Sequence, residues 1–377
     1  MRRLIASAVA VAACTLALAG VASAAVGTVY VSPPGSASCG GGPTYTTISD
    51  GIAHAAPGDR VVVCPGTYAE DVVVDRSVDL VGMNATVQPD PNDTSSPLAG
   101  DLGTNAFTVL AANVSISGFT ATGATGDGIL LVGDHANVEH VLAQGNGGNG
   151  IMLESSSWST VRGNRVTGNA GGIELANDAA TGAVPQELLD AWGSSGTAAH
   201  DVVQRNLVVG NPEACGILLV DHAGVGDELG IHDNLIAENV VTGNAMHGFG
   251  GGVLLASPVP GGAVYDNQIV GNAISGNGLA GVTIHSHAPG QNFSGNTIVR
   301  NFIGTNNLKG AQQEPDDPET TGVFIGSQDP LSVTVAANVI TGDHYGIFTA
   351  GPVTIVGGGT NLFLGVAVPF GSKPTYE

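Results

Sequence analysis

One short phrase recurs through most of this chain and limits what the chain can fold into. Each copy has a glycine, a β-branched residue and then alternating apolar positions. Copies begin at Gly128, Gly150, Gly172, Gly216, Gly252, Gly281, Gly322 and Gly346. Repeats with periods of about 20–50 residues are typical of solenoids, and period-2 apolar alternation is typical of strands. The phrase therefore predicts a solenoid whose coils are built from short strands and turns.

Asparagine recurs after another strand of each predicted coil. The copies lie at Asn164, Asn206, Asn234, Asn267, Asn296 and Asn338. Asparagine tolerates left-handed backbone angles, and its amides can bond to one another in an in-register stack, so it suits the corners of a coil. Later coils contain a further five-residue step between asparagines, as in 239–244, 272–277 and 301–306. We therefore expect an extra strand and a wider cross-section from about Ile231 onward.

The start of the chain resembles a known protein superfamily. The stretch 45–72, with Tyr45-Thr-Thr-Ile48 and Val61-Val-Val-Cys-Pro65-Gly-Thr-Tyr68, and the following Ser77-Val-Asp-Leu-Val81-Gly are similar to the N-terminal cap and first coil of the pectin-lyase-like superfamily. NosD-like proteins and pectin methylesterases share this opening. The resemblance extends over residues 28–365. It implies an all-β fold, a right-handed parallel β-helix with a short N-terminal capping helix.

The chain is expected to divide into four parts. Residues 1–24 have a basic start, an apolar run and an Ala-Ser-Ala end, which are typical of a cleaved signal peptide. A cap over 25–60, with a helix near 48–55, precedes a β-helix over 61–365 and a tail over 366–377. Insertions are expected at 178–200 and 305–321. A membrane anchor fits less well, and so does a lipoprotein modified at Cys14.

Charge and composition limit the partners. The formal net charge is −22, and only 11% of residues are charged. Removing Arg2 and Arg3 with the signal peptide would take the charge to −24. An acidic surface disfavours nucleic acid and anionic membranes, and it also disfavours a bare polyuronate unless a cation bridges the two. We expect a secreted, extracellular monomer with no membrane span.

Three cysteines remain after the signal peptide. Cys39 and Cys64 both lie in the expected cap, so export predicts a disulfide between them. Cys215 directly precedes a repeated glycine, where a small buried thiol is favoured over a reactive one. No spacing typical of a structural zinc site is present.

Titratable residues gather where the Gly-Ile strands end. Equivalent residues on adjacent coils lie about 4.8 Å apart, so they form a column. The catalytic candidates in this column are Asp178, Asp221, His222, His285 and His287, and Glu154 and Glu174 are candidate substrate-binding residues at its edge. Carboxylates could act as acid and base or hold Ca²⁺, and a mixture of aspartate and histidine could hold a transition metal. The alternative is that polar residues simply mark turns.

A longer insertion begins beside this column. Its segment 184–192 is predicted to form a short helix, with Pro185 in the first turn and Gly193 after it. The outward positions Leu218 and Leu254 on the neighbouring coils are apolar. We expect Leu188, Leu189 or Trp192 to cover this patch, and Trp192 is the third candidate substrate-binding residue.

The active-site motifs of the pectin-lyase-like enzymes do not appear in this chain. We find no match to those of pectin methylesterases or polygalacturonases, and Arg162, Arg165 and Arg205 lie outside the column. The leading hypothesis is a secreted β-helix protein that binds or processes a polysaccharide; if it is an enzyme, we expect a polysaccharide lyase or a glycoside hydrolase. The alternative is a non-enzymatic structural or NosD-like accessory protein of the cell envelope. No cofactor is certain, and Ca²⁺ is the candidate ion.

Overall fold

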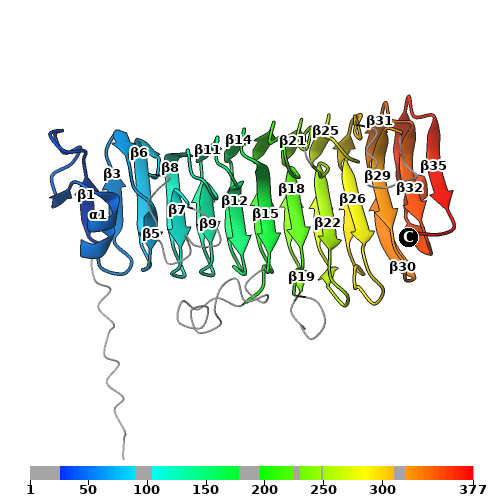
Figure 1. Cartoon of the computed structure of the whole chain (residues 1–377), viewed down its shortest axis with the longest axis horizontal. Coiled ribbons are helices and arrows are strands. Elements are labelled where there is room, and N and C mark those ends of the chain that lie inside the picture. Colours follow the sequence, from blue (N-terminus) through cyan, green and yellow to red (C-terminus); the bar gives the residue numbers. More distant parts are fainter. Residues whose placement is uncertain are drawn as a thin grey trace, which may run out of the picture.

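The computed structural model is a single long stack of coils (Figure 1). It describes residues 26–90, 104–177, 196–223, 230–247, 249–309 and 319–376. All strand pairs in this described part are parallel, and each coil adds one rung to the stack. No helix within these ranges is long and apolar enough to cross a membrane. The all-β solenoid predicted from the repeats is confirmed.

One wall of the stack is an 11-stranded sheet, here called the second sheet. It holds the Gly-Ile strands, and Figure 1 shows many of them side by side. In chain order they are β5 (Val72–Val74), β7 (Phe107–Val109), β9 (Ile129–Leu131), β12 (Asn149–Glu154), β15 (Gly171–Ala176), β18 (Ile217–Val220), β22 (Val253–Ser257), β26 (Val282–Ser286), β29 (Thr321–Gly326), β32 (Tyr345–Ala350) and β35 (Val368–Lys373). Because β35 pairs with β32, the solenoid extends past the boundary expected at residue 365.

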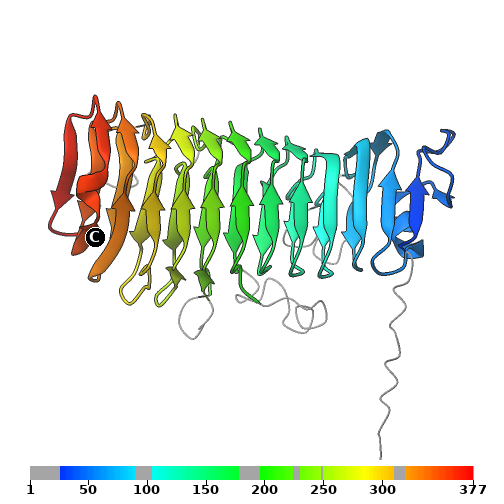
Figure 2. The same ribbon diagram turned by 180° about the vertical axis from the view of Figure 1, so that it is seen from behind.

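The other walls belong to a 22-stranded sheet, here called the first sheet. The long strands β6 and β8 each pair with both of its rows, so they join them. Figure 2 shows the stack from behind. The strands are β1 (Thr28–Val31), β2 (Thr44–Tyr45), β3 (Arg60–Val63), β4 (Gly66–Tyr68), β6 (Asp79–Val87), β8 (Ser115–Thr122), β10 (Asn137–Glu139), β11 (Leu142–Gln144), β13 (Thr160–Arg162), β14 (Arg165–Thr167), β16 (Val202–Gln204), β17 (Leu207–Val209), β20 (Leu235–Ala237), β21 (Val240–Thr242), β24 (Gln268–Val270), β25 (Ala273–Ser275), β27 (Thr297–Val299), β28 (Phe302–Ile303), β30 (Leu331–Ala336), β31 (Val339–Thr341), β33 (Val353–Val356) and β34 (Leu362–Leu364).

Two small elements complete the described coils. A two-stranded sheet pairs β19 (Ile231–His232) with β23 (Val264–Tyr265). A 3₁₀ helix, η2 (Gly358–Thr360), precedes β34. The core lies inside the stack and is made of inward Val, Ile and Leu side chains, one layer per coil. Each layer touches only its neighbours, as in other solenoids.

Three ladders of polar side chains run through the corners of the stack. In each, a backbone N–H donates to the side-chain oxygen one coil further on, over 2.7–3.2 Å. The first ladder is Ser159, Asp201, Asn234, Asn267 and Asn296. The second is Asn164, Asn206, Asn239, Asn272, Asn301, Asn338 and Asn361. The third is Asn146, Asn169, Asn211, Asn244, Asn277, Asn306 and Asp343.

These ladders correct the expected widening of the stack. Asn206 lies in the column of Asn239, not of Asn234, because β17 pairs with β21 and β16 pairs with β20. In the earlier coils Ser159 and Asp201 occupy the position that Asn234 occupies later. The five-residue step therefore exists before Ile231 as well, and the later coils gain no extra strand from it.

The N-terminal end is closed by α1 (Ile48–His54), at the position predicted for the capping helix. Thr47 caps it by accepting a hydrogen bond from the backbone of Asp50 at 3.1 Å. The carboxylate of Glu70 accepts from the first backbone N–H groups of the helix, where the helix dipole favours negative charge. Ile48 and Ile52 are buried against the first coil.

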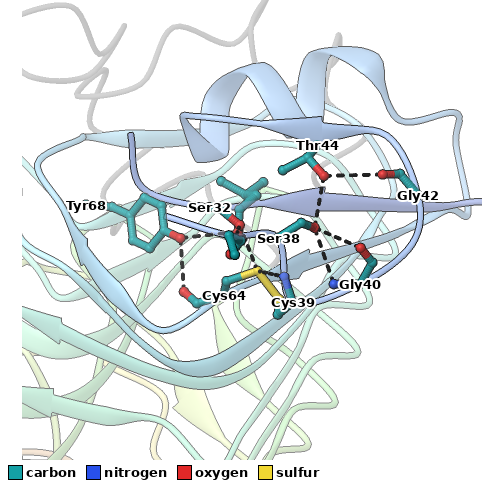
Figure 3. The surroundings of a disulfide bond; sticks show 10 residues. Ser32, Ser38, Cys39, Gly40, Gly42, Thr44, Cys64 and Tyr68 are labelled. Atoms are coloured by element: carbon teal, nitrogen blue, oxygen red, sulfur yellow. Dashed lines mark hydrogen bonds between the residues drawn. A yellow bond between two sulfur atoms is a disulfide. The ribbon is translucent and has the colours of Figure 1, made fainter. Parts of the chain in front are cut away.

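The predicted disulfide joins Cys39 to Cys64 across the cap, with the two Cα atoms 5.6 Å apart (Figure 3). The hydroxyl of Ser32 donates to the Cys64 sulfur at 3.0 Å, and Tyr68 donates to the Cys64 carbonyl at 2.9 Å. Burial, with a smaller contribution from Glu70, raises the pKa of Tyr68 to about 12. Cys215 is free and buried, and burial raises the pKa of its thiol to about 12. The prediction of an unreactive thiol at this position agrees with that environment.

Candidate functional site

Outward side chains of the second sheet form two rows across successive coils. The first row is Met152, Glu174, Leu218, Leu254, Thr283, Phe324 and Phe348. The second row is Glu154, Ala176, Val220, Ala256, His285 and Gly326. Residues in one row lie about 4.8 Å from their neighbours. The alignment of Gly-Ile strands expected from the repeats is therefore the alignment in the structure.

A groove lies on this outer face over β18, β22 and β26. Its cavity volume is about 320 Å³. The lining residues, which define the groove from here on, are Leu218, Val220, His222, Phe249, Gly250, Leu254, Ala256, Pro258, Leu279, His285 and His287. The floor is the apolar patch of Leu218 and Leu254 that the sequence predicts to be covered.

Three of the five catalytic candidates line the groove, and all three are histidines. His222 is half-buried after β18, and its backbone N–H donates to the Asn177 side chain at 2.9 Å. His285 is buried within β26, and His287 is exposed just after it, with the ring centroids 4.3 Å apart. The three histidines form a rim along the groove. His222 comes two residues after Val220, and Val220 lies in the same row as His285, two strands away. The two ends of the rim are therefore roughly 10 Å apart.

The structure places Asp221 away from the groove. Its carboxylate is fully buried and accepts hydrogen bonds from Asn177 at 2.8 Å and from the backbone of Ala223 at 2.9 Å. It also accepts from the backbone of Ala263 on the next coil. The side chain of Asp221 therefore ties successive coils together, which agrees with the alternative that polar residues here serve the turns.

The two glutamates lie at the edge of the outer face. Glu154 is fully buried and accepts from the Ser155 hydroxyl at 2.9 Å. Glu174 is half-buried beside Leu218, and it accepts from the Asn149 amide at 2.6 Å. Neither glutamate lines the groove. The remaining candidates, Asp178 and Trp192, lie outside the described residues, as does the predicted helix 184–192.

The C-terminal segment closes one end of the outer face. The Tyr376 hydroxyl lies 3.2 Å from His285 Nδ1 and fixes the orientation of that ring. The same tyrosine ring lies over Gly326, where a Cβ atom would approach it to 2.6 Å. Phe324 and Phe348 continue this aromatic cluster toward the last coils. A glycine at position 326 thus gives Tyr376 room to reach the histidine.

Sequence reasoning missed Phe249, Leu279 and Tyr376. Phe249 and Leu279 come from loops rather than from repeated strand positions, so no column contains them. Tyr376 meets a histidine 91 residues earlier in the chain, and no local pattern signals such a contact. Phe249 is 71% exposed, and Lys309 Nζ lies 5.9 Å from the centroid of its ring.

The lining limits the chemistry that the groove could support. Imidazoles can accept or donate a proton near neutral pH, and the apolar floor can pack against the apolar faces of a ligand. The described lining contains no carboxylate, so it offers Ca²⁺ none of the charged oxygen ligands that the ion prefers.

The comparisons agree on the fold. The molecule has the right-handed parallel β-helix fold. A family model described as a right handed beta helix region matches residues 98–184. No curated protein matches the chain significantly.

Two solved structures from Azotobacter vinelandii are similar over most of the chain. The A-module of mannuronan C-5 epimerase AlgE4 has 16% identity and a TM-score of 0.57, covering 85% of this chain and 91% of its own. The A-module of mannuronan C-5 epimerase AlgE6 has 18% identity and a TM-score of 0.55, covering 87% and 91%. At such identities the likeness concerns the fold.

Proposed function

We propose that this protein is secreted and binds an extended polysaccharide in the groove. The observation that carries the proposal is the composition of the groove: an apolar floor, an exposed aromatic ring and a rim of three histidines from β26 and from the turns after β18 and β26. Contiguous apolar surface on the outside of a protein is typical of a binding site. The disulfide in the cap supports an oxidising compartment.

The shape and the lining suit a sugar polymer. Sugar rings present apolar C–H faces and polar edges, which match the aliphatic floor and the imidazole rim respectively. Phe249 offers an exposed ring on which one sugar can pack. The similar A-modules belong to enzymes named for mannuronan, a polysaccharide, which is in line with this proposal.

If the bound polymer is processed, an elimination catalysed by a lyase fits the groove better than hydrolysis. A lyase needs a base to remove the proton beside the uronate carboxyl group and an acid to protonate the leaving oxygen, and His285 and His287 could share these two roles. Glycoside hydrolysis ordinarily needs two carboxyl groups flanking the bond. Asp221 is buried and bonded elsewhere, and the described lining contains no carboxylate.

The charge of the protein bears on the identity of the polymer. At a formal net charge of −22 the protein repels a bare polyuronate over long range. Lys309 and the histidine rim are local exceptions near the groove. A neutral polymer therefore fits the binding proposal best, whereas the lyase reaction requires a uronate, whose charge a cation such as Ca²⁺ would have to bridge.

The test is a panel of neutral and uronate polysaccharides, assayed for binding by affinity electrophoresis and for turnover by reducing ends and unsaturated products, with and without Ca²⁺. Phe249→Ala should weaken binding by about 3–10-fold, the usual contribution of one aromatic contact. Phe302→Ala is the matched control, because Phe302 is 52% exposed but lies on β28 of the first sheet. Equal affinities for the two variants would contradict a binding site in the groove.

If a polymer binds, assays of turnover distinguish an enzyme from a binding protein without catalytic activity. His285→Gln and His287→Gln should abolish unsaturated products while leaving affinity within a few-fold, if the histidines act as base. Binding without any product would favour the second hypothesis, a non-enzymatic or NosD-like accessory protein of the envelope. Failure of every polymer to bind would reject the polysaccharide proposal.

A further inference from the structure

A second cluster of side chains lies at a corner of the stack, and none of its members lines the groove. Successive coils place a residue with left-handed backbone angles at this corner, and these residues are His135, Trp158, His200, Asp233 and Asp266, with φ values of 54–61°. Each of the first three backbone N–H groups donates to the carbonyl that precedes the next residue of the column. The column therefore stacks one residue per coil.

Aromatic rings hold two imidazoles at this corner. The indole of Trp158 stacks on His200 with 4.0 Å between centroids. His232, the neighbour of Asp233, stacks on Tyr265 at 4.8 Å. The two imidazoles meet edge to face, 5.5 Å apart at an angle of 84°. Each imidazole therefore packs against one aromatic ring and also against the other imidazole.

Three potential ligand atoms converge here. One atom each from His200, His232 and Asp233 lies within 4.8 Å of the other two. His232 Nδ1 is 2.8 Å from a carboxylate oxygen of Asp233. The His232 side chain is 17% exposed and that of Asp233 is 47% exposed, so an ion can reach them from solvent.

We infer that His200, His232 and Asp233 form a binding site for a divalent transition-metal ion, with Zn²⁺ as the reference ion. Two imidazoles and one carboxylate are a donor set that suits zinc, copper or nickel, whereas Ca²⁺ prefers oxygen ligands alone. Zn²⁺ binds these atoms at about 2.0–2.2 Å, so small side-chain rotations suffice to close the site. A fourth position stays open to water.

Such an ion would join two successive coils. His200 belongs to one coil, and His232 and Asp233 belong to the next. An ion that binds only the folded chain raises its stability in proportion to the logarithm of the ion concentration. The site is independent of the groove, so its existence does not rest on polysaccharide binding.

The test is calorimetric titration of the untagged chain with Zn²⁺, together with visible absorption after Co²⁺ loading. We expect one ion per chain. His200→Asn, His232→Gln and Asp233→Asn should each weaken Zn²⁺ binding by about tenfold or more, since even residues that only orient metal ligands usually contribute tenfold or more. Asparagine is chosen at positions 200 and 233 because it tolerates the left-handed backbone there.

His140→Asn is the matched control. His140 also has a left-handed backbone, with a φ of 54°, and lies 4.0 Å from Glu139, but it is not part of the converging cluster. This variant should bind Zn²⁺ like the parent. For each variant the melting temperature in EDTA is its own reference, and added Zn²⁺ should raise the melting temperature above that reference only where the three ligands are intact. Absence of Zn²⁺ binding, or equal loss in His140→Asn, would overturn the inference.

Discussion

At the scale of single residues, the ladders determine which side chain each corner can hold. An asparagine both accepts from the preceding coil and donates from its amide, as Asn234 does to Asn267 and to the Ala198 carbonyl. Asp201 occupies the same kind of position with a carboxyl group. It accepts from the Ser159 backbone at 2.7 Å, but its second oxygen is buried with no hydrogen bond in the described part of the chain.

Asp201→Asn should therefore stabilise the protein in a pH-dependent way. Burial raises the pKa of Asp201 well above its usual range, and only the backbone bond from Ser159 opposes this shift. A raised folded-state pKa means that the carboxyl group favours folding below its unfolded pKa and loses that contribution as pH rises toward the folded value. The gain of the asparagine variant should be near zero at pH 4 and reach about 1–3 kcal/mol in alkaline buffer.

Thermal melts between pH 4 and pH 9 would measure this gain. Asn234→Asp, one coil further along the same ladder, is the reverse control and should lose stability as pH rises. A difference between Asp201→Asn and the parent that does not change with pH would show that the carboxyl group has the same pKa in the folded and unfolded states.

The repeated glycine also has a local cause, which Gly252 illustrates. A Cβ atom there would lie 2.5 Å from the Gly281 carbonyl oxygen and 2.9 Å from the Asn277 amide of the third ladder. Gly252→Ala should destabilise the protein by about 1–3 kcal/mol, the usual result of overpacking. Gly359→Ala, where a Cβ atom meets nothing within 4 Å, should leave the melting temperature almost unchanged. Equal melting temperatures for the two variants would contradict this explanation.

At the scale of elements, the repeats predicted strands better than they predicted corners. In most copies of the Gly-Ile phrase the glycine lies against the third ladder, as Gly252 does. That glycine marks the register of its strand, so the outward rows could be predicted from the repeats. The corner motif is less specific: Asn206-Leu-Val and Asn234-Leu-Ile look alike but belong to different ladders. In the first ladder Ser159 and Asp201 occupy positions that hold asparagine in later coils, and a search for repeated asparagines does not find them.

The candidate site was predicted only in part, for a related reason. The columns brought His222 and His285 to one face because strand register carries that information. Whether a side chain at the end of a strand points outward, like His222, or inward, like Asp221, depends on the turn that follows. Contacts from loops, such as Phe249, and from the distant Tyr376 depend on the whole chain.

The cap is the element whose stability can be tested most directly. The Cys39–Cys64 bridge closes a loop with a sequence separation of 25 residues. Replacing both cysteines by serine should cost about 3 kcal/mol in the chain-entropy model. A reductant should lower the melting temperature of the parent and leave that of the double variant unchanged. Cys215→Ser should still respond to the reductant, and loss of that response would mean that Cys215 takes part in the bridge.

At the scale of the whole molecule, whether a stack of coils stays monomeric depends on how its two ends are protected. The parallel strands would expose unpaired backbone groups at each end, and such edges favour pairing with other chains. At the C-terminal end β35 pairs with β32 as the final rung, and it contains Pro369 and Lys373, residue types that disfavour further pairing at an edge strand. The expectation that the protein is a monomer depends on this rung and on α1.

Deleting residues 367–377 should therefore cause self-association. The deletion removes β35 and leaves β32 as an open edge beside the aromatic residues Phe324 and Phe348. Deleting only residues 374–377 is the control, because it removes Tyr376 but keeps β35. Light scattering after size exclusion should show larger species only for the longer deletion. Monomers in both cases would mean that the edge is protected in another way.

The hydrogen bonds from backbone N–H groups to side-chain oxygens in the ladders also share one direction along the axis of the stack. In all three, each backbone N–H on the earlier coil donates to a side-chain oxygen on the later one, as between Asn164 and Asn206. Amide dipoles aligned in this way add up and polarise one another along the axis, much as peptide dipoles do in a helix. The backbone N–H groups of the ladders thus point their positive ends toward the C-terminal end of the stack. The third ladder ends there on the carboxyl group of Asp343, whose oxygen accepts from the Asn306 backbone at 2.9 Å and so meets the positive end of the last N–H group.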